Sequence, residues 1–350
     1  MSTPSAALAF VGAGSLGQTY AALLARSGQA VTLLATPSTA ARLLAAKQIR
    51  LVGVVDVSVP VAPAPAPPGS VGITDDPARL PPGVGLVFTT KGHHLPAAVA
   101  SVRAAWPGAD DAAAWVAGVQ NGVAKDDVLT EAFGAARVVG AATILGAGRV
   151  ETGEVRVTSL GMTYLGEFSG ERSARVAAAT AALAAAGIPA EEPGDIRGVL
   201  WSKACNAAGV FGVAVLAAPN GPWLFHNPDL MRAYLALVRE TAAIARAEGV
   251  RVGNYPHFPP IRTYAEEPIG EIIAAMPPPP APAEPATPAA PPSHPSMVQD
   301  FLAGRPMEVD EIFGDLVARA ERGGIPAPTL AFVRDVLRGL NGASRAAGTR

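Results

Sequence analysis

The stretch LAFVGAGSLG, residues 8–17, joins a short apolar run to a glycine-rich turn, and an alanine- and leucine-rich segment follows directly. This order predicts a strand, a tight turn and a helix. In a GxGxxG turn the first glycine permits the sharp turn, the second lets the backbone approach a pyrophosphate, and the third allows close helix-to-strand packing. The first N–H groups of the helix also face the anion. We therefore predict a dinucleotide phosphate site made by Gly12, Gly14, Ser15, Leu16 and Gly17.

A second apolar run, Ala30 to Ala35, follows the helical stretch after Ser27 and Gly28. It completes a strand–helix–strand unit of the length typical of parallel sheets. The predicted fold class is therefore α/β, with a Rossmann-type dinucleotide-binding domain at the N-terminus.

The end of this second strand bears on the choice of cofactor. NAD-binding domains usually carry an Asp or Glu there, which binds the ribose 2′-hydroxyl and would repel a 2′-phosphate. This chain has Ala35-Thr36-Pro37-Ser38-Thr39 and no acid. The pattern favours NADP(H), with Thr36, Ser38 and Arg42 as candidate phosphate partners. NAD(H) stays open, because the arginine that commonly follows this strand in NADP users is missing.

Composition and charge exclude several kinds of partner and site. The chain has 350 residues, of which 49% are hydrophobic and 16% charged, which is enough for two domains with real cores. The net charge of −2 and the lack of a basic cluster argue against nucleic acid and membrane surfaces as partners. The N-terminal apolar run is too short for a signal peptide or a span, so we expect a cytoplasmic protein. A single cysteine, Cys205, excludes a disulfide framework, and we expect no metal site.

Residues 1–192 alternate between apolar runs and helical stretches and form the predicted dinucleotide-binding domain. The alternation is typical of a parallel sheet, and the closely spaced later runs predict antiparallel strands that close it. A helix is expected over Ser173 to Ala186, because Gly187 and Pro189 follow as stop signals. The predicted strands after the second are Val84 to Thr89, Ala113 to Val119, Val138 to Ile144, Glu154 to Thr158 and Met162 to Phe168.

Residues 193–350 form a predicted second domain, which is mostly α-helical. A proline- and alanine-rich insert, residues 277–295, interrupts it and predicts an extended surface segment, with a ligand for another protein as the alternative. The predicted helices are Ile196 to about Ala218, Pro228 to Glu248, Met307 to Arg322 and Thr329 to about Leu340.

Three residues are candidates for carbonyl chemistry. Lys91 comes two residues after the strand ending at Thr89, and Asn121 follows the strand ending at Val119, so both lie at the carboxyl edge of the sheet. Lys203 stands at the start of an otherwise apolar helix, Ala204 to Ala218, and desolvation lowers the pKa of a buried lysine, which suits it to proton donation. The alternatives are an exposed loop lysine, a turn asparagine and a snorkelling lysine.

Taken together, these motifs resemble the ketopantoate reductase (2-dehydropantoate 2-reductase) family over nearly the whole chain apart from the proline-rich insert. Ser296 and Glu308 add the most specific part, because they have the twelve-residue spacing of the family's serine and glutamate. The matching segments, in chain order, are GAGSLG at 12–17, TTKG with Lys91, VQNG with Asn121, WSK with Lys203, and PSMVQD at 295–300 followed by GRPMEVD at 304–310.

The resemblance implies NADPH-dependent reduction of a 2-ketoacid to a 2-hydroxy acid in pantothenate biosynthesis, and a homodimer formed through the helical domain. Lys203 would be the general acid, and Glu308 would position Lys203 and the substrate. Ser296 would bind the substrate, and Lys91 and Asn121 would lie where cofactor and substrate meet. Glu308 is also a candidate cofactor contact. For Ser296 and Glu308 the alternatives are a helix N-cap and an ordinary solvated helix acid.

The chain departs from the family pattern on the helix of Lys203. The family's two asparagines correspond to Ala207 and Phe211, and Asn206 is displaced by one residue, about 100° around the helix. Asn206 is kept as a candidate substrate-binding residue. The apolar positions leave open a divergent 2-hydroxyacid or opine-type dehydrogenase acting on another ketone. A non-catalytic NADP(H)-binding sensor is the other alternative. His93 and His94, beside Lys91, are predicted to be exposed loop histidines, with a contact to a different substrate as the alternative.

Overall fold

The computed structural model describes residues 7–106, 113–150, 152–217, 225–278 and 294–347. It divides into two compact units, one of Met1–Gln120 with Lys125–Arg197, the other of Asn121–Ala124 with Gly198–Arg350. The main division falls between Arg197 and Gly198, a few residues after the predicted position between residues 192 and 193. Ile196 explains part of the difference, because its side chain packs directly on Gly166 of the first unit.

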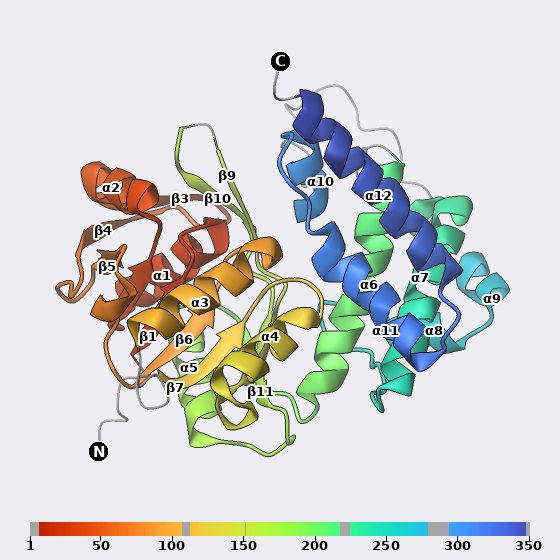
Figure 1. The fold of residues 1–350 in the computed structure, drawn as a ribbon, viewed down its shortest axis with the longest axis horizontal. Helices are drawn as coiled ribbons and strands as arrows, with labels where there is room; N and C mark the ends of the chain where they lie inside the picture. The colour runs from red at the N-terminus through yellow and green to blue at the C-terminus, as the bar shows by residue number, and fades with distance from the viewer. Residues whose placement is uncertain (1–6, 107–112, 151, 218–224, 279–293, 348–350) are drawn as a thin grey trace. The chain divides into compact units, whose positions relative to one another are not determined.

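The first unit is built on a large twisted sheet (Figure 1). Among the described residues it has nine strands, in the order β7-β6-β1-β2-β5-β4-β3-β10-β9. From β7 to β4 all neighbours are parallel, while β4 and β3, and β10 and β9, pair antiparallel. The strands are β1 (Leu8–Val11), β2 (Val31–Leu34), β3 (Gln48–Gly53), β4 (Val57–Pro63), β5 (Val71–Thr74), β6 (Val84–Phe88), β7 (Ala113–Gly118), β9 (Gly146–Arg149) and β10 (Val155–Ser159).

A second, three-stranded sheet has the order β12-β11-β8. Its strands are β8 (Val139–Thr143), β11 (Thr163–Glu167) and β12 (Ala190–Glu191), and β11 pairs antiparallel with β8. The predicted closing strands therefore exist, and two of them, β8 and β11, pair antiparallel, but the run between them joins the other sheet. The run at Val155 extends the large sheet through β3, whereas the run at Thr163 belongs to the smaller sheet.

Helices cover both faces of the large sheet. They are α1 (Ser15–Arg26), α2 (Pro37–Ala46), α3 (Leu95–Ala105), α4 (Ala124–Phe133) and α5 (Ala174–Ala185), with short 3₁₀ turns η1 (Pro77–Arg79), η2 (Gly92–His94) and η3 (Ala135–Arg137). Alternate residues of β1 enter opposite cores: Leu8 and Phe10 face the α1 side, and Ala9 and Val11 face the other. This burial on both faces is what a central parallel strand requires.

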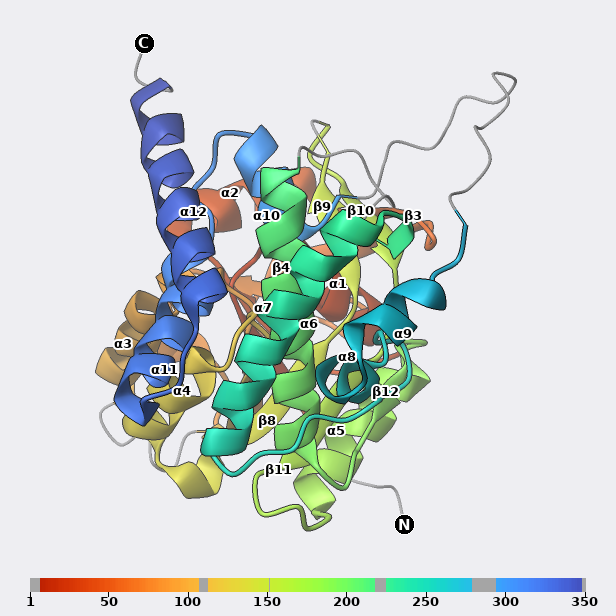
Figure 2. The same cartoon turned by 90° about the vertical axis from the view of Figure 1, so that its right-hand side faces the viewer.

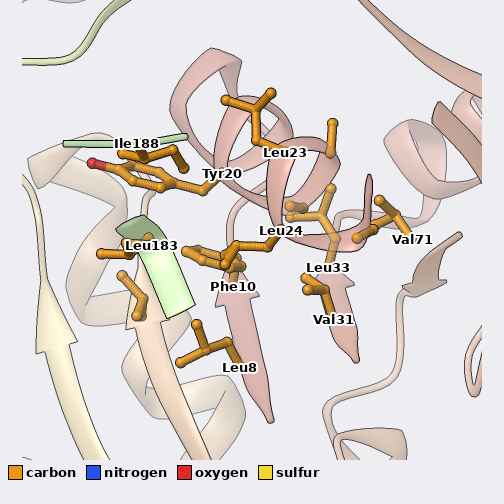
Figure 3. Close-up of a cluster of buried hydrophobic side chains, with 14 of the residues drawn as sticks. Leu8, Phe10, Tyr20, Leu23, Leu24, Val31, Leu33, Val71, Leu183 and Ile188 are labelled. Atoms are coloured by element: carbon orange, nitrogen blue, oxygen red, sulfur yellow. The ribbon is translucent and has the colours of Figure 1, made fainter. Parts of the chain in front are cut away.

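The core on the α1 side also contains the hydroxyl groups of Tyr20, Thr143 and Thr163, of which Figure 3 shows that of Tyr20. The ring of Tyr20 stacks on Phe10 at 5.7 Å, and its hydroxyl donates to Thr143 Oγ1 at 2.7 Å and lies 2.6 Å from Thr163 Oγ1. A small apolar cavity lies beside these groups. Since Thr143 and Thr163 belong to β8 and β11, the Tyr20 hydroxyl ties α1 to the smaller sheet.

The second unit is helical, as predicted, and α7 lies between α11 and α12 on one side and α8 and α9 on the other (Figure 2). Glycines of α6 receive side chains of α7: a Cβ at Gly212 would lie 2.8 Å from Leu237 Cδ1. The helices are α6 (Ile196–Leu216), α7 (Pro228–Ala247), α8 (Ile261–Glu266), α9 (Ile269–Ala274), α10 (Ser296–Leu302), the π-helical turn η5 (Asp310–Gly314), α11 (Asp315–Gly323) and α12 (Pro328–Ala347).

One predicted helix needs a corrected start, and most of the proline-rich insert lies outside the described residues. The helix expected from Met307 starts later, because Met307 and Glu308 lie outside any helix and the π-helical turn precedes α11. Residues 279–293 of the proline-rich insert lie outside the described residues. One helix in the described part of the chain, α6, is long and apolar enough to cross a membrane, but 72% of its most apolar window is buried inside the protein, as in a core helix.

Replacing Tyr20 by Phe tests the tie between α1 and the smaller sheet. We expect the free energy of unfolding, from urea denaturation near neutral pH, to fall by about 1–2 kcal/mol, because the threonine hydroxyls lose a buried partner. Burial raises the pKa of Tyr20 above 10.0. Its stabilising effect is therefore complete below about pH 10 and declines as the unfolded chain ionises above it, so the deficit of the variant should shrink at higher pH.

Tyr264→Phe is the control, because it removes the same hydroxyl from a half-buried tyrosine whose hydroxyl makes no hydrogen bond among the described residues. An equal loss in both variants, or none in Tyr20→Phe, would contradict a specific role for the Tyr20 hydroxyl.

Candidate active site

The glycine turn after β1 is built so that side chains are excluded at two positions. Gly12 has φ +113°, and a Cβ there would lie 2.8 Å from the Thr90 nitrogen. A Cβ at Gly17 would overlap the Gly12 carbonyl oxygen and lie 2.6 Å from Thr89 Oγ1. At Gly14 the nearest atom to such a Cβ is Thr89 O at 3.9 Å, so the backbone there stays approachable.

Residues at the ends of β6 and β7 hold this turn in place. Thr89 N donates to Val11 O at 2.8 Å, and Thr89 Oγ1 donates to Gly12 O at 2.7 Å. The buried Gln120 donates through Nε2 to Phe88 O and Thr90 O, each at 3.1 Å. The turn is thus fixed from the side by side-chain-to-backbone hydrogen bonds.

The start of α1 fits an anion. Its N-cap is Gly14, no side chain caps the helix, and its first turn carries no acid. The first backbone N–H groups of such a helix have no intrahelical partner and attract negative charge. Together with the open face of Gly14, this geometry fits the pyrophosphate of a dinucleotide.

Hydroxyl groups gather at the end of β2. Thr36 is the N-cap of α2, and its Oγ1 lies 3.1 Å from Thr39 Oγ1 and 3.4 Å from Ser38 Oγ. A carboxylate follows the neighbouring strand β5: Ala35 N donates to Thr74 O, and the exposed Asp75 comes directly after Thr74. Sequence reasoning missed Asp75 because it did not identify β5, and it searched for an acid only after the second strand.

Lys91 and the two histidines form a short turn in the same unit. Lys91 is the N-cap of η2, and it follows β6 by three residues rather than the predicted two, because β6 ends at Phe88. The rings of His93 and His94 meet edge to face, with their centroids 4.2 Å apart. Lys91 is partly buried, which differs from the exposed loop lysine considered as an alternative.

Lys203 lies on α6, in the second unit. The prediction that it heads a helix is wrong: α6 begins at Ile196, so Lys203 stands about two turns inside it. Three positions of this stretch, Lys203, Asn206 and Val210, are partly exposed, while the residues between them are buried. Since residues three or four apart are neighbours on a helix, Lys203 and Asn206 share one accessible stripe.

Asn206 is fixed by a hydrogen bond. Tyr234 Oη donates to Asn206 Oδ1 at 2.9 Å, and burial raises the pKa of Tyr234 well above its ordinary value. The Tyr234 hydroxyl therefore stays protonated and keeps donating. The family positions Ala207 and Phe211, by contrast, are 5% and 7% exposed, so both side chains are buried.

Ser296 and Glu308 belong to the same unit as Lys203. Ser296 is the first residue of α10, whose N-cap is Pro295, so Ser296 is not the N-cap considered as an alternative. Glu308 is 4% exposed, so it is not a solvated helix acid either. The π-helical turn η5 begins two residues later, and such turns are frequent at functional sites.

The segment of Asn121 meets that turn. Asn121–Ala124 belongs to the second unit, and Gly122, at φ +82°, is so close to the turn that a Cβ would lie 2.9 Å from Glu311 O. Burial, with smaller effects from the charges of Glu308 and Asp310, raises the pKa of Glu311. The structure thus brings the segments of Asn121 and Glu308 together through η5.

The candidate residues are divided between the two units. The glycine turn, Thr36 and Lys91 belong to the first, and Asn121, Lys203, Asn206, Ser296 and Glu308 to the second. Among the residues that the structure describes, no group of three or more His, Cys, Asp or Glu could hold a metal ion.

Replacing Gly17 by Ala tests the close approach in the turn. We expect a loss of about 1–3 kcal/mol in the free energy of unfolding, because the new methyl group overlaps the Gly12 carbonyl. Gly339→Ala is the control, since Gly339 also lies within a helix but has open space around it, and should gain about 0.5–1 kcal/mol. A neutral Gly17→Ala variant in urea denaturation would contradict the observed geometry.

Comparison with known proteins agrees with this arrangement. Two family models match the chain: "Ketopantoate reductase PanE/ApbA" over residues 8–170 and its C-terminal counterpart over residues 195–341. The 2-dehydropantoate 2-reductase of Halobacterium salinarum is 26% identical over 330 residues, covering 93% of this chain and 96% of that protein.

Solved structures show the same fold. A PanE/ApbA family ketopantoate reductase from Ralstonia eutropha JMP134 has a TM-score of 0.73 at 24% identity, covering 97% of this chain and 99% of its own. A D-mandelate dehydrogenase solved with NADH and anilino(oxo)acetate has a TM-score of 0.74 at 18% identity, covering 97% and 99%. With both family models spanning its two units, the chain belongs to the ketopantoate reductase family.

Proposed function

We propose that this protein catalyses the NADPH-dependent reduction of a 2-ketoacid, with 2-dehydropantoate as the first candidate, to the corresponding 2-hydroxy acid. The observation that carries the proposal is the accessible stripe of α6, where Lys203 and the hydrogen-bonded Asn206 lie close together and the residues between them are buried. The side-chain-free glycine turn supports a dinucleotide as the second reactant. Membership of the family supports the reaction class.

The proposed chemistry is a hydride transfer followed by, or coupled to, a proton transfer. When bound, the reduced nicotinamide supplies the hydride. As the ketone carbon takes the hydride, the carbonyl electron pair moves onto oxygen, and Lys203 Nζ donates a proton to that oxygen. A positioned general acid of this kind speeds a reaction by roughly 10²- to 10⁴-fold. The products are the alcohol and a neutral lysine amine, which solvent reprotonates.

The remaining residues would bind and orient. Glu308, buried in the same unit, would hold Lys203 and the substrate in position, while Ser296 and Asn206 would donate to the substrate's carboxylate or hydroxyl. Lys91 and Asn121 would bind where the nicotinamide and the substrate meet.

For the cofactor we propose NADP(H). The three hydroxyls at the start of α2 suit a 2′-phosphate, and β2 itself carries no acid. Asp75, directly after the adjacent strand, would repel a 2′-phosphate, because its carboxylate and the phosphate are both negatively charged. The relative with bound NADH makes NADH the competitor to test.

The second candidate substrate is a 2-ketoacid with a bulky apolar group. Ala207 and Phe211, both buried, replace the two amides expected at these positions, so fewer hydrogen-bonding groups are available along α6. The D-mandelate dehydrogenase with anilino(oxo)acetate is a relative of the same fold whose bound ketoacid is aromatic. The homodimer stays a prediction of the resemblance, and the cytoplasmic location stays a prediction from the N-terminal sequence.

A panel of ketoacids tests the proposed function. The purified protein is mixed with 2-dehydropantoate, 2-ketoisovalerate, phenylglyoxylate and pyruvate, and the absorbance of NADPH and of NADH is followed in parallel. We expect oxidation of NADPH with at least one branched or aromatic ketoacid. Binding of NADPH without oxidation by any of them would contradict the enzymatic function and favour a sensor.

Lys203→Ala should lower kcat by about 10²- to 10⁴-fold, because the general acid is removed, while the dissociation constant for NADPH stays within about twofold. Lys203→Arg should be equally slow, since a guanidinium keeps the charge but does not give up its proton at neutral pH. The control is Lys47→Ala, on an exposed lysine after α2. Retained turnover in Lys203→Ala would exclude the general-acid role.

A further inference from the structure

The large sheet is curved, and its last strands, β10 and β9, lie beside α1, the helix that follows β1 (Figure 1). Helix α1 contacts β1 and β2 and also β9 and β10 at the other end of the strand order. Leu16, in the glycine turn, and Ala147, in β9, pack against the same apolar core. The hairpin of β9 and β10 therefore lies beside the first turn of α1.

The register of this hairpin places Arg149 on the α1 side. Arg149 lies opposite Val155 of β10, and directly opposite residues in an antiparallel pair project from the same face. Val155 is fully buried in the α1 core. Arg156, opposite Gly148, therefore projects from the other face and is exposed.

The guanidinium of Arg149 reaches the glycine turn. Its Nη2 donates to Ala13 O at 3.1 Å, and the same carbonyl oxygen accepts from Gln18 Nε2 at 2.8 Å. Ala13 directly precedes Gly14, the N-cap of α1. The positive charge thus lies next to the first N–H groups of the helix.

We propose that Arg149 is a cofactor-binding residue whose guanidinium donates to the pyrophosphate of the dinucleotide held by the glycine turn. The proposal rests on the proposed function, because it assumes a dinucleotide at that turn. A pyrophosphate carries two negative charges, whereas a helix terminus supplies only about half a positive charge. The first turn of α1, Ser15-Leu16-Gly17, has no cationic side chain. Arg149 supplies that charge, in the planar fork that matches phosphate oxygens.

The position of the contact selects the pyrophosphate over the 2′-phosphate. Ala13 follows β1, where the phosphates bind in this fold, whereas the adenosine ribose lies at the end of β2, at Thr36. Arg149 should therefore serve NADPH and NADH alike.

The test compares dissociation constants of the full-length protein and its Arg149→Ala variant for NADPH, NADH and 2′-AMP, measured by calorimetry at low and high salt. We expect Arg149→Ala to weaken NADPH and NADH by a similar factor, about tenfold or more, and to leave 2′-AMP unchanged. The salt dependence of NADH binding should also become shallower. Arg149→Lys should fall between the two, because it keeps the charge without the fork.

Arg156→Ala is the matched control, with the same charge change on the opposite face of the hairpin, and should bind as the unaltered protein does. Thermal unfolding of each variant separates binding from stability. Unchanged affinities in Arg149→Ala, with or without a lower Tm, would overturn the proposal and leave Arg149 as a structural tether. A loss confined to NADPH and 2′-AMP would overturn it as well. If the unaltered protein bound neither dinucleotide, the proposed function itself would fail.

Discussion

The absence of side chains where α1 meets β1 is the constraint on which the rest of this protein depends. The Cα of Gly17 lies so close to the Gly12 carbonyl that no Cβ fits between them. This approach seats α1 against the sheet, and Thr89 then fixes the turn from β6. Helix α1 in turn contacts the later strands β9 and β10. No side chain caps its N-terminus, so its first N–H groups can bind a ligand.

A second constraint acts within the helical unit. The π-helical turn η5 brings Glu311 O against Gly122, and this contact explains why four residues from the first half of the sequence belong to the second unit. Glu308 is buried two residues before that turn. A mutation in η5 could therefore change the position of Asn121 without touching any ligand. The polar groups of α6 are fixed differently, by the Tyr234 hydroxyl bound to Asn206.

The sequence predicted the elements whose local signals agree with their surroundings. The strand, turn and helix over residues 8–26 were predicted because apolar periodicity and glycine spacing point the same way. Strands β4 and β9 were missed for identifiable reasons: Val57–Pro63 contains two prolines, and Gly146–Arg149 is Gly-Ala-Gly-Arg, which has almost no strand propensity. Their pairing comes from the curl around α1, a tertiary effect. For the same reason Arg149 drew no attention in the sequence. The roles carried over from the family to residues such as Lys203 and Glu308 stay predictions. The structure shows only that Glu308 is buried, and not solvated as the alternative had it.

A crystal structure of the protein with NADPH would show whether the side-chain-free turn is a pyrophosphate site. We expect a phosphate oxygen within hydrogen-bond distance of the backbone N–H of Ser15 or Leu16, above the open face of Gly14. A dinucleotide bound elsewhere, or one whose phosphates face away from the start of α1, would contradict it.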